Sequence, residues 1–332
     1  MMKNISIAIA LSAAIFAYAS QAQADCGTVT IANMNWQSAE LLASVDSAIL
    51  TAGFGCKVEL ISGDTVPSIT SMAEKGQPDI APEGWVNNVP ETMKRGLEEK
   101  TLVVVSEPLS EGGVQGLWIP KYFADSHPNI RTIEDVLAHP ELFPAPEDST
   151  KGGIVTAPQG WGAAIIVAQL FKAYGADKAG FVMVDPGSAA GLDGSLAKAY
   201  ERKEPWVGYY WSPTSLLGKY EMVKLAHGVG YDEAEWKRCT TVVDCSDPEP
   251  NDWPKDRVET IVTQGFVARA GYALDYLKKR TWSNAVVSQL SAWMTENQAS
   301  GQDGAKHFLQ TYPEVWTTWV SPEVAEKVKA AL

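Results

Sequence analysis

The chain has 332 residues, of which 45% are hydrophobic, and its 40 acidic and 27 basic side chains give a formal charge of −13. Such acidity disfavours nucleic acids and anionic membrane surfaces as partners. The length exceeds what a single hydrophobic core usually supports, so we expect two lobes.

The first 24 residues are typical of a cleaved secretory signal. Lys3 precedes an apolar stretch, and Ala22 and Ala24 supply the small residues of a cleavage site before Asp25. A lipid anchor at Cys26 is the alternative, but Asp25 stands where such anchors need a small residue. The segment carries one lysine and no acidic residue, so its removal changes the formal charge from −13 to −14. We expect a soluble protein exported to the periplasm.

Four cysteines allow three disulfide pairings in an oxidising compartment. Cys26 and Cys56 each precede a predicted strand, so they can be bridged if those strands are parallel neighbours. Cys239 and Cys245 would then close a short loop. A zinc site is the alternative, but neither Cys-x-x-Cys nor His-x-x-x-His spacing is present.

Strand and helix signals alternate from residue 27 onward, which predicts an α/β fold with mostly parallel sheets. In the first part, Ser38 is a predicted helix cap, Gly53 follows the end of that helix, and Pro67 opens a shorter one. In chain order the strands are 28–32, 57–61 and 79–81, with helices at 38–52 and 67–75 between them.

The second part continues the alternation. Its strands are predicted at 114–120, 154–156, 182–184 and 206–211, with helices at 132–137, 162–174 and 192–202. Residues 244–256 are rich in Asp, Glu and Pro and indicate a surface loop, and helices at 283–297 and 322–332 close the chain. We place a first lobe at 25–117, a second at 118–215, and a hinge return with the rest of the first lobe at 216–332.

Four tryptophans stand at or after the ends of predicted strands: Trp36, Trp85, Trp161 and Trp211. Open α/β sheets present their binding crevice at the carboxyl ends of their strands. Indole faces carry negative quadrupole density, so several faces around one space suit a bulky cation such as a trimethylammonium group. The alternative for any single indole is ordinary packing, which we expect for Trp206 because Trp206 and Trp211 point to opposite faces of a strand.

Two further features lie beside these indoles. Glu83 is two residues before Trp85, and a carboxylate there would favour a cationic ligand and accept a hydrogen bond from it; a solvated charge is the alternative. The loop 156–163 joins a strand to a helix, where backbone N–H groups attract negative charge. A carboxylate or N-oxide oxygen could bind there, unless the loop is an ordinary turn.

Enzyme signatures are weak. Ser195 and Lys198 match a β-lactamase motif, but its companion motifs are missing and both residues fall in an amphipathic helix. The four histidines lie outside every strand-end loop.

An exported enzyme using Glu83 and Asp185 is one alternative to a binding protein, and a receptor for a sugar or amino acid is another. The loop 244–256 lacks the EF-hand spacing expected of a calcium site.

Taken together, five segments resemble the substrate-binding proteins of ABC importers for glycine betaine, choline and carnitine. The segments are 35–36, 82–85, 116–120, 159–162 and 204–213, and the resemblance covers nearly the whole mature chain. It implies a type II periplasmic binding protein, whose two α/β lobes close on the ligand as a clamshell. It also implies a monomer without a cofactor that delivers its ligand to an ABC permease.

The resemblance also assigns residues to the site. It implies that the four strand-end tryptophans surround the methylated onium head and that the N–H groups of Gly162 and Ala163 face any carboxylate. The His or Arg side chain that often holds a carboxylate in betaine receptors is missing from these loops. We therefore expect trimethylamine N-oxide or glycine betaine, then choline, with carnitine and dimethylsulfoniopropionate behind them.

Overall fold

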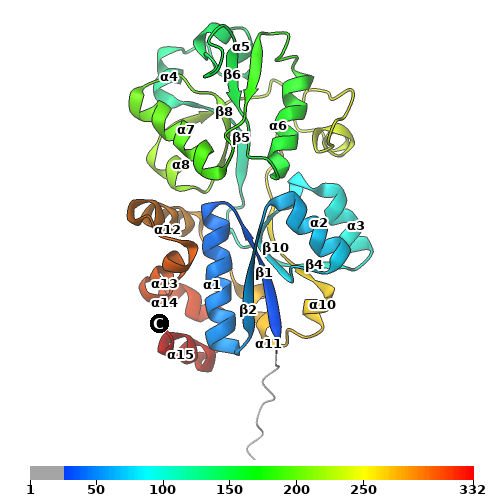
Figure 1. Cartoon of the computed structure of the whole chain (residues 1–332), viewed down its shortest axis with the longest axis vertical. Coiled ribbons are helices and arrows are strands. Elements are labelled where there is room, and N and C mark those ends of the chain that lie inside the picture. The colour runs from blue at the N-terminus through cyan, green and yellow to red at the C-terminus, as the bar shows by residue number, and fades with distance from the viewer. Residues whose placement is uncertain (1–25) are drawn as a thin grey trace, which may run out of the picture.

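The computed structural model describes residues 26–332, and the signal predicted at residues 1–24 lies outside the described residues. Two lobes are stacked along the long axis of the molecule (Figure 1). Each lobe contains one five-stranded sheet flanked by helices. The predicted two-lobed α/β architecture is therefore confirmed.

The sheet of the first lobe has the strand order β2-β1-β3-β10-β4. β1 pairs in parallel with β2 and β3, whereas β10 is antiparallel to β3 and β4. All six residues of β3 are buried, as expected for a strand whose sheet is covered on both faces. The strands are β1 (Thr28–Met34), β2 (Lys57–Gly63), β3 (Ile80–Trp85), β4 (Leu102–Ser106) and β10 (Val258–Thr263).

Helices of the first lobe come from both ends of the chain, and α12 to α15 lie beside α1 (Figure 1). The first helix is buried around most of its circumference and is capped at its C-terminus by Gly55, which has a φ of 74°. The helices of the first lobe are α1 (Gln37–Phe54), α2 (Thr65–Lys75), α3 (Pro90–Glu98), α10 (Gln264–Val267), α11 (Tyr272–Lys279), α12 (Asn284–Asn297), α13 (Gly301–Thr311), α14 (Pro313–Trp316) and α15 (Pro322–Ala330), with the short turns η1 (Val86–Asn88) and η4 (Thr317–Trp319).

Two details of α1 differ from the sequence prediction. Trp36 stands at the N-cap, and Ser38, predicted as the cap, lies in the first turn and donates a hydrogen bond to Glu83. Gly53 does not follow the helix but lies within it, where a Cβ atom would come within 2.6 Å of Val324. The glycine therefore allows α15 to pack closely on α1.

The sheet of the second lobe has the order β7-β6-β8-β5-β9. β6 is parallel to β7 and β8, and β5 is antiparallel to β8 and β9. The elements are β5 (Val114–Pro120), α4 (Lys121–Ser126), α5 (Ile133–Leu137), η2 (Pro140–Leu142), β6 (Gly152–Val155), α6 (Gly162–Ala173), β7 (Phe181–Val184), α7 (Ala189–Arg202), β8 (Gly208–Ser212), α8 (Ser215–Lys219), β9 (Met222–Lys224), α9 (Glu233–Glu235) and η3 (Trp236–Thr240).

The chain crosses between the lobes twice, between β4 and β5 and again before β10. The crossings lie side by side, since the N–H of Gly113 donates to the carbonyl oxygen of Asp256 at 3.2 Å. Both boundaries differ from the sequence prediction: β5 lies wholly in the second sheet, and β9 pairs with β5, so the chain stays in the second lobe beyond residue 216. After each crossing the chain starts a new strand at the hinge, β5 in the second sheet and β10 in the first. These two strands therefore run away from the cleft, antiparallel to the strands that end there.

The four cysteines form two disulfides, Cys26–Cys56 and Cys239–Cys245. The first ties the leading ends of the parallel neighbours β1 and β2, where Thr28 is in register with Lys57. The predicted pairing is therefore the one in the structure.

Replacing Cys26 and Cys56 by alanine is expected to lower the free energy of unfolding by about 3–4 kcal/mol, because a loop of 30 residues is released in the unfolded chain. The Cys239–Cys245 loop spans 6 residues, and its removal should cost about 2 kcal/mol. Urea denaturation of the two double variants measures both values. A larger loss from the short loop would contradict this entropic account.

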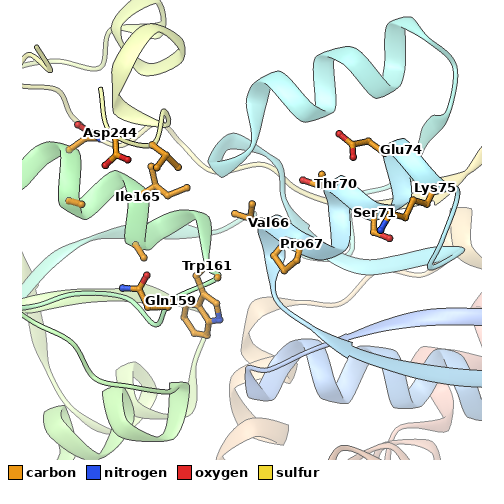
Figure 2. Close-up of a pocket in the computed structure, with 15 residues that line it drawn as sticks. Val66, Pro67, Thr70, Ser71, Glu74, Lys75, Gln159, Trp161, Ile165 and Asp244 are labelled. Atoms are coloured by element: carbon orange, nitrogen blue, oxygen red, sulfur yellow. The ribbon is translucent and has the colours of Figure 1, made fainter. Parts of the chain in front are cut away.

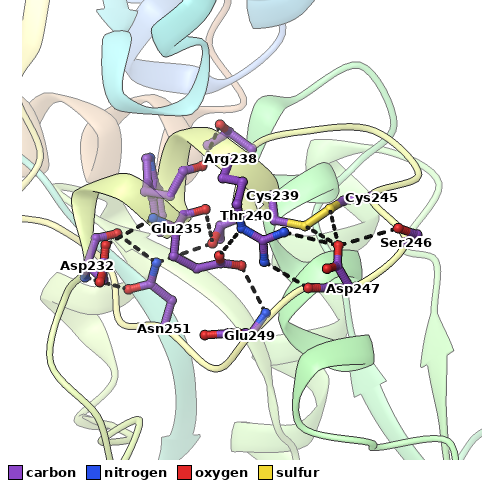
Figure 3. Close-up of polar contacts among 12 residues, drawn as sticks. Asp232, Glu235, Arg238, Cys239, Thr240, Cys245, Ser246, Asp247, Glu249 and Asn251 are labelled. Carbon is purple, nitrogen blue, oxygen red and sulfur yellow. Dashed lines mark hydrogen bonds and ion pairs between the residues drawn. A yellow bond between two sulfur atoms is a disulfide. The ribbon is translucent and has the colours of Figure 1, made fainter.

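The acidic loop 244–256 folds against α9 and η3 through a polar network (Figure 3). Arg238 donates to Glu235 at 2.8 Å and to Asp247 at 3.0 Å, and the N–H of Glu249 donates to Glu235 at 2.9 Å. Within residues 26–332, one trio of potential metal ligands is close enough to share an ion: Asp247 and the two cysteines of the short loop. Both sulfur atoms are bonded to each other, so neither is a free thiolate.

Across residues 26–332, none of the helices is both long and apolar enough to cross a bilayer.

Candidate functional site

A small cavity lies between the lobes, at the carboxyl ends of strands from both sheets. It brings together all four tryptophans singled out in the sequence. Trp36 and Trp85 stand at the ends of β1 and β3 in the first lobe, and Trp161 and Trp211 at the start of α6 and in β8 of the second. The cavity is lined by Trp36, Thr65, Trp85, Asn88, Gln115, Trp161, Ala163, Tyr209 and Trp211.

The indole of Trp161 stands almost at right angles to those of Trp36 and Trp211. The centroids of Trp36 and Trp161 are 5.4 Å apart with an interplanar angle of 72°, and those of Trp161 and Trp211 are 5.1 Å apart at 85°. Perpendicular rings form adjoining walls of a box rather than a stack. All four indoles are at most 5% exposed, so a group held between them would be shielded from water.

The indole N–H groups of the first lobe point to one carboxylate. Glu83 Oε1 accepts hydrogen bonds from Trp36 Nε1 at 2.7 Å, from Trp85 Nε1 at 3.0 Å and from the hydroxyl of Ser38 at 3.0 Å. Glu83 and Trp85 are two residues apart on β3 and so share one face of the strand. Glu83 does not line the cavity. It lies at the N–H edges of the two indoles, whereas the sequence analysis predicted that it contacts the ligand directly.

Trp161 is held by the opposite lobe. Its Nε1 donates to Asn35 Oδ1 at 2.6 Å. Asp64 lies beside this contact: burial raises the pKa of its carboxyl, and hydrogen bonds from Asn35 and Trp161 partly lower that pKa again. Asp64 stands at the N-cap of α2 without capping it. Closure of the lobes therefore fixes the Trp161 ring.

The polar lining of the cavity was not predicted from the sequence. Asn88 and Gln115 exchange two amide hydrogen bonds, of 3.1 and 3.0 Å, across the lobes. The hydroxyl of Tyr209 donates to Gln115 at 2.7 Å. Asn88 is in the turn after β3 and Gln115 in the first residues of β5, and isolated amides carry no recognisable motif. The available signals were that Asn88 lies three residues after Trp85 and that Gln115 lies just after the first crossing between the lobes.

Gly162 and Ala163 form the first turn of α6, whose leading N–H groups lack intrahelical partners. Ala163 lines the cavity. Gly162 instead faces the first lobe: an added Cβ would lie 2.6 Å from Asn88 Cβ and 2.8 Å from the Asn88 carbonyl oxygen. Glycine at this position therefore allows the two lobes to approach each other.

The lobes also meet around the cavity, so the structure is a closed form. Val66 N donates to Gly160 O at 3.2 Å on one side. Trp236 Nε1 donates to Asn87 O at 2.7 Å near the hinge. On the opposite side from α2, Thr295 of α12 and Ser215 of α8 are 3.4 Å apart, hydroxyl to hydroxyl.

Beside the cavity a larger groove of about 660 Å³ separates α2 from α6 (Figure 2). Thr70, Ser71 and Glu74 line its first-lobe wall, and Ile165 lies on the wall of the second lobe. Trp161 borders both spaces. The groove is open to solvent and lacks the enclosing indoles of the cavity.

Residues assigned to packing or set aside in the sequence lie away from the cavity. Trp206 is buried in the second lobe, and its Nε1 donates to the hydroxyl of Ser195 at 3.1 Å. Ser195 therefore serves as an acceptor within packed structure. No histidine lines the cavity, whose walls are wholly within the described residues.

Comparison with known proteins identifies a family and several similar folds. Residues 27–311 match the model of the substrate-binding domain of ABC-type glycine betaine transport systems. A choline-binding protein of an ABC transporter, solved with choline, is similar over 92% of this chain and 98% of its own, with 19% identity and a TM-score of 0.72. A glycine betaine/L-proline-binding protein from Borrelia burgdorferi is 18% identical over 91% of this chain and 99% of its own, with a TM-score of 0.70.

A third solved structure is closed around its ligand. It is lactococcal OpuAC in complex with glycine betaine, which is 18% identical over 89% of this chain and 100% of its own, with a TM-score of 0.67. At these identities the structures establish a shared fold, and the family assignment rests on the match over residues 27–311. The chain belongs to the family of substrate-binding domains of ABC-type glycine betaine transport systems.

Proposed function

We propose that this protein captures a methylated onium compound, trimethylamine N-oxide or glycine betaine before choline, in the cavity between its lobes. The observation that carries the proposal is the box of four buried indoles, two from each lobe, around one space. A trimethylammonium head cannot donate an N–H hydrogen bond, so its attraction must come from aromatic faces and nearby negative charge.

The energetics support binding without a salt bridge. A desolvated contact between a cation and an indole face contributes about 2 kcal/mol or more, so several such contacts can offset the ligand's lost freedom. Because Trp161 and Trp211 reach the cavity from the second lobe, the full set of walls exists only when the lobes are closed. Binding and closure are therefore coupled.

The polar end of the ligand has defined candidates. The N–H groups at the start of α6 suit a carboxylate or an N-oxide oxygen, and the hydroxyl of Thr65 and the amides of Asn88 and Gln115 also line the cavity. In the absence of a cationic side chain on the cavity wall, a full carboxylate is held only by dipoles. A short ligand with one oxygen, such as trimethylamine N-oxide, needs fewer such dipoles than a carboxylate does.

A thermal-shift screen tests the proposal. A ligand that binds only the native state stabilises it by about 2.7 kcal/mol at a hundred times its Kd, so at equal concentration the tightest ligand gives the largest shift. We expect trimethylamine N-oxide or glycine betaine to raise the melting temperature most, choline less, and carnitine and dimethylsulfoniopropionate least. Arginine and glucose serve as negative controls. A response to either control, with none to the onium compounds, would replace this function by that of another solute receptor.

The remaining parts of the proposal follow from the family. The mature protein would act in the periplasm as a monomer after removal of its signal, and would pass its ligand to the membrane subunits of an ABC permease without a cofactor. Catalysis is not part of the proposal, because the cavity is lined by indoles, amides and hydroxyls, and Glu83 is not on its wall but accepts hydrogen bonds from two of the indoles.

A further inference from the structure

Behind the indoles of the first lobe lies a chain of buried charges. Asp46 and Arg280 are both fully buried, and Arg280 Nε is 3.0 Å from Asp46 Oδ1. Arg280 also donates to Thr260 Oγ1 at 2.7 Å and to the carbonyl oxygen of Pro82 at 3.1 Å. The next residue after Pro82 is Glu83, which is 1% exposed. The charges alternate from the core towards the cavity.

In this row of buried charges, Glu83 is the one group without a charged partner of its own. Arg280 lies near enough to act on Glu83 but is already paired with Asp46. Burial raises the pKa of the Glu83 carboxyl, and the hydrogen bonds from Trp36 and Trp85 partly lower it. Glu83 Oε2 is buried and has no hydrogen-bond partner within the described residues. A buried charge in this state is costly unless a cation approaches it.

We propose that the onium head of the ligand is the missing countercharge, and that Glu83 acts on it through the indoles of Trp36 and Trp85 without contacting it. A carboxylate that accepts an indole N–H bond directs the N–H edge away from the cavity. It also places negative charge at the N–H edge of the ring, which polarises the ring and makes the face turned to the ligand more attractive to a cation. Glu83 is thus a positioning residue that also sets the charge preference of the site.

The arrangement is preformed. Trp36, Ser38, Trp85 and Arg280, which contact or act on Glu83, all belong to the first lobe. Opening of the cleft therefore leaves the charge in place. The open protein presents a first lobe that already favours a positive group, and the second lobe adds the remaining walls.

The inference rests on the proposed function, and it is tested by a pair of ligands of the same shape but different charge. Choline is compared with its neutral carbon analogue, dimethylbutanol, in which a carbon atom replaces the nitrogen. Calorimetric titration gives the ratio of the two affinities for the wild type and for Glu83→Gln. The amide oxygen of glutamine can still accept the indole N–H groups, so this variant removes charge and keeps the geometry.

We expect the preference for choline over the analogue to fall roughly tenfold or more in Glu83→Gln. Glu259→Gln is the matched control, because Glu259 is also a buried carboxylate of the same sheet, 6% exposed, and lies 3.5 Å from Arg257. The control should keep the wild-type ratio. Glu83→Asp, which retains the charge, should also keep most of the preference even where its overall affinity is lower.

An unchanged ratio in Glu83→Gln would overturn the inference, as would an equal loss of both ligands, since the glutamate would then only orient the rings. Either result leaves the proposed function intact. Failure of the wild type to bind any onium compound in the thermal-shift screen would instead overturn the proposed function and this inference with it.

Discussion

Replacement of Trp161 by alanine is expected to weaken binding of the onium ligand by about two to three orders of magnitude. The change removes one wall of the box, at about 2 kcal/mol for a desolvated cation–π contact. It also removes the perpendicular neighbour of Trp36 and Trp211, and the 2.6 Å hydrogen bond to Asn35 that joins the lobes. Isothermal titration calorimetry with the ligand identified by thermal shift measures the loss.

Trp293 provides the matched control for this variant. It lies in α12, away from the cavity, and stacks on His307 with ring centroids 3.9 Å apart. Trp293→Ala should bind with wild-type affinity. Trp161→Phe, which keeps an aromatic face but loses the N–H donor, should fall between the two. Wild-type affinity in Trp161→Ala would exclude this indole from the site.

Replacement of Gly162 by alanine is expected to prevent closure while leaving each lobe folded. The added Cβ would meet Asn88 Cβ at 2.6 Å and the Asn88 carbonyl oxygen at 2.8 Å, and both atoms belong to the opposite lobe. Gly162 is the first residue of α6 and its φ is not positive, so alanine fits the isolated second lobe. We expect roughly a hundredfold loss of affinity, because the box is complete only in the closed form.

Small-angle X-ray scattering and calorimetry together check this prediction, since the variant should stay extended at ligand concentrations that compact the wild type. Gly194→Ala is the control: Gly194 lies in α7 of the same lobe, and an added Cβ meets nothing within 4 Å. It should bind normally and melt slightly higher, because alanine favours a helix over glycine. Normal compaction of Gly162→Ala would show that Asn88 yields to the added methyl.

Much of the site could be predicted because its aromatic residues carry a positional signal. Trp85 ends β3, and Trp36 and Trp161 lie in the loops after β1 and β6; the carboxyl ends of such strands meet at one edge of an α/β sheet. The role of Glu83 was harder to infer. Its spacing from Trp85 shows that both share a face of β3, but only the fold brings Trp36 and Ser38 to the same oxygen.

The hinge and the polar lining could not be predicted, for a physical reason. Gln115 and Asn88 meet across the lobes, and the crossing is completed by the pairing of Gly113 with Asp256, more than a hundred residues away. Local periodicity contains no information about such contacts. The strand β10 was missed likewise, because its buried pattern follows a polar loop rather than a helix.

The position of β10 has a consequence for the order of assembly. This strand lies between β3 and β4 in the first sheet, yet it is contributed by Val258–Thr263, after the entire second lobe. The ribosome must therefore synthesise most of the chain before the first sheet can acquire the strand that joins β3 to β4. Pairing across so long a sequence separation is intrinsically slow. A nascent chain with this connectivity stays unfinished during synthesis, a state compatible with threading through a secretion channel.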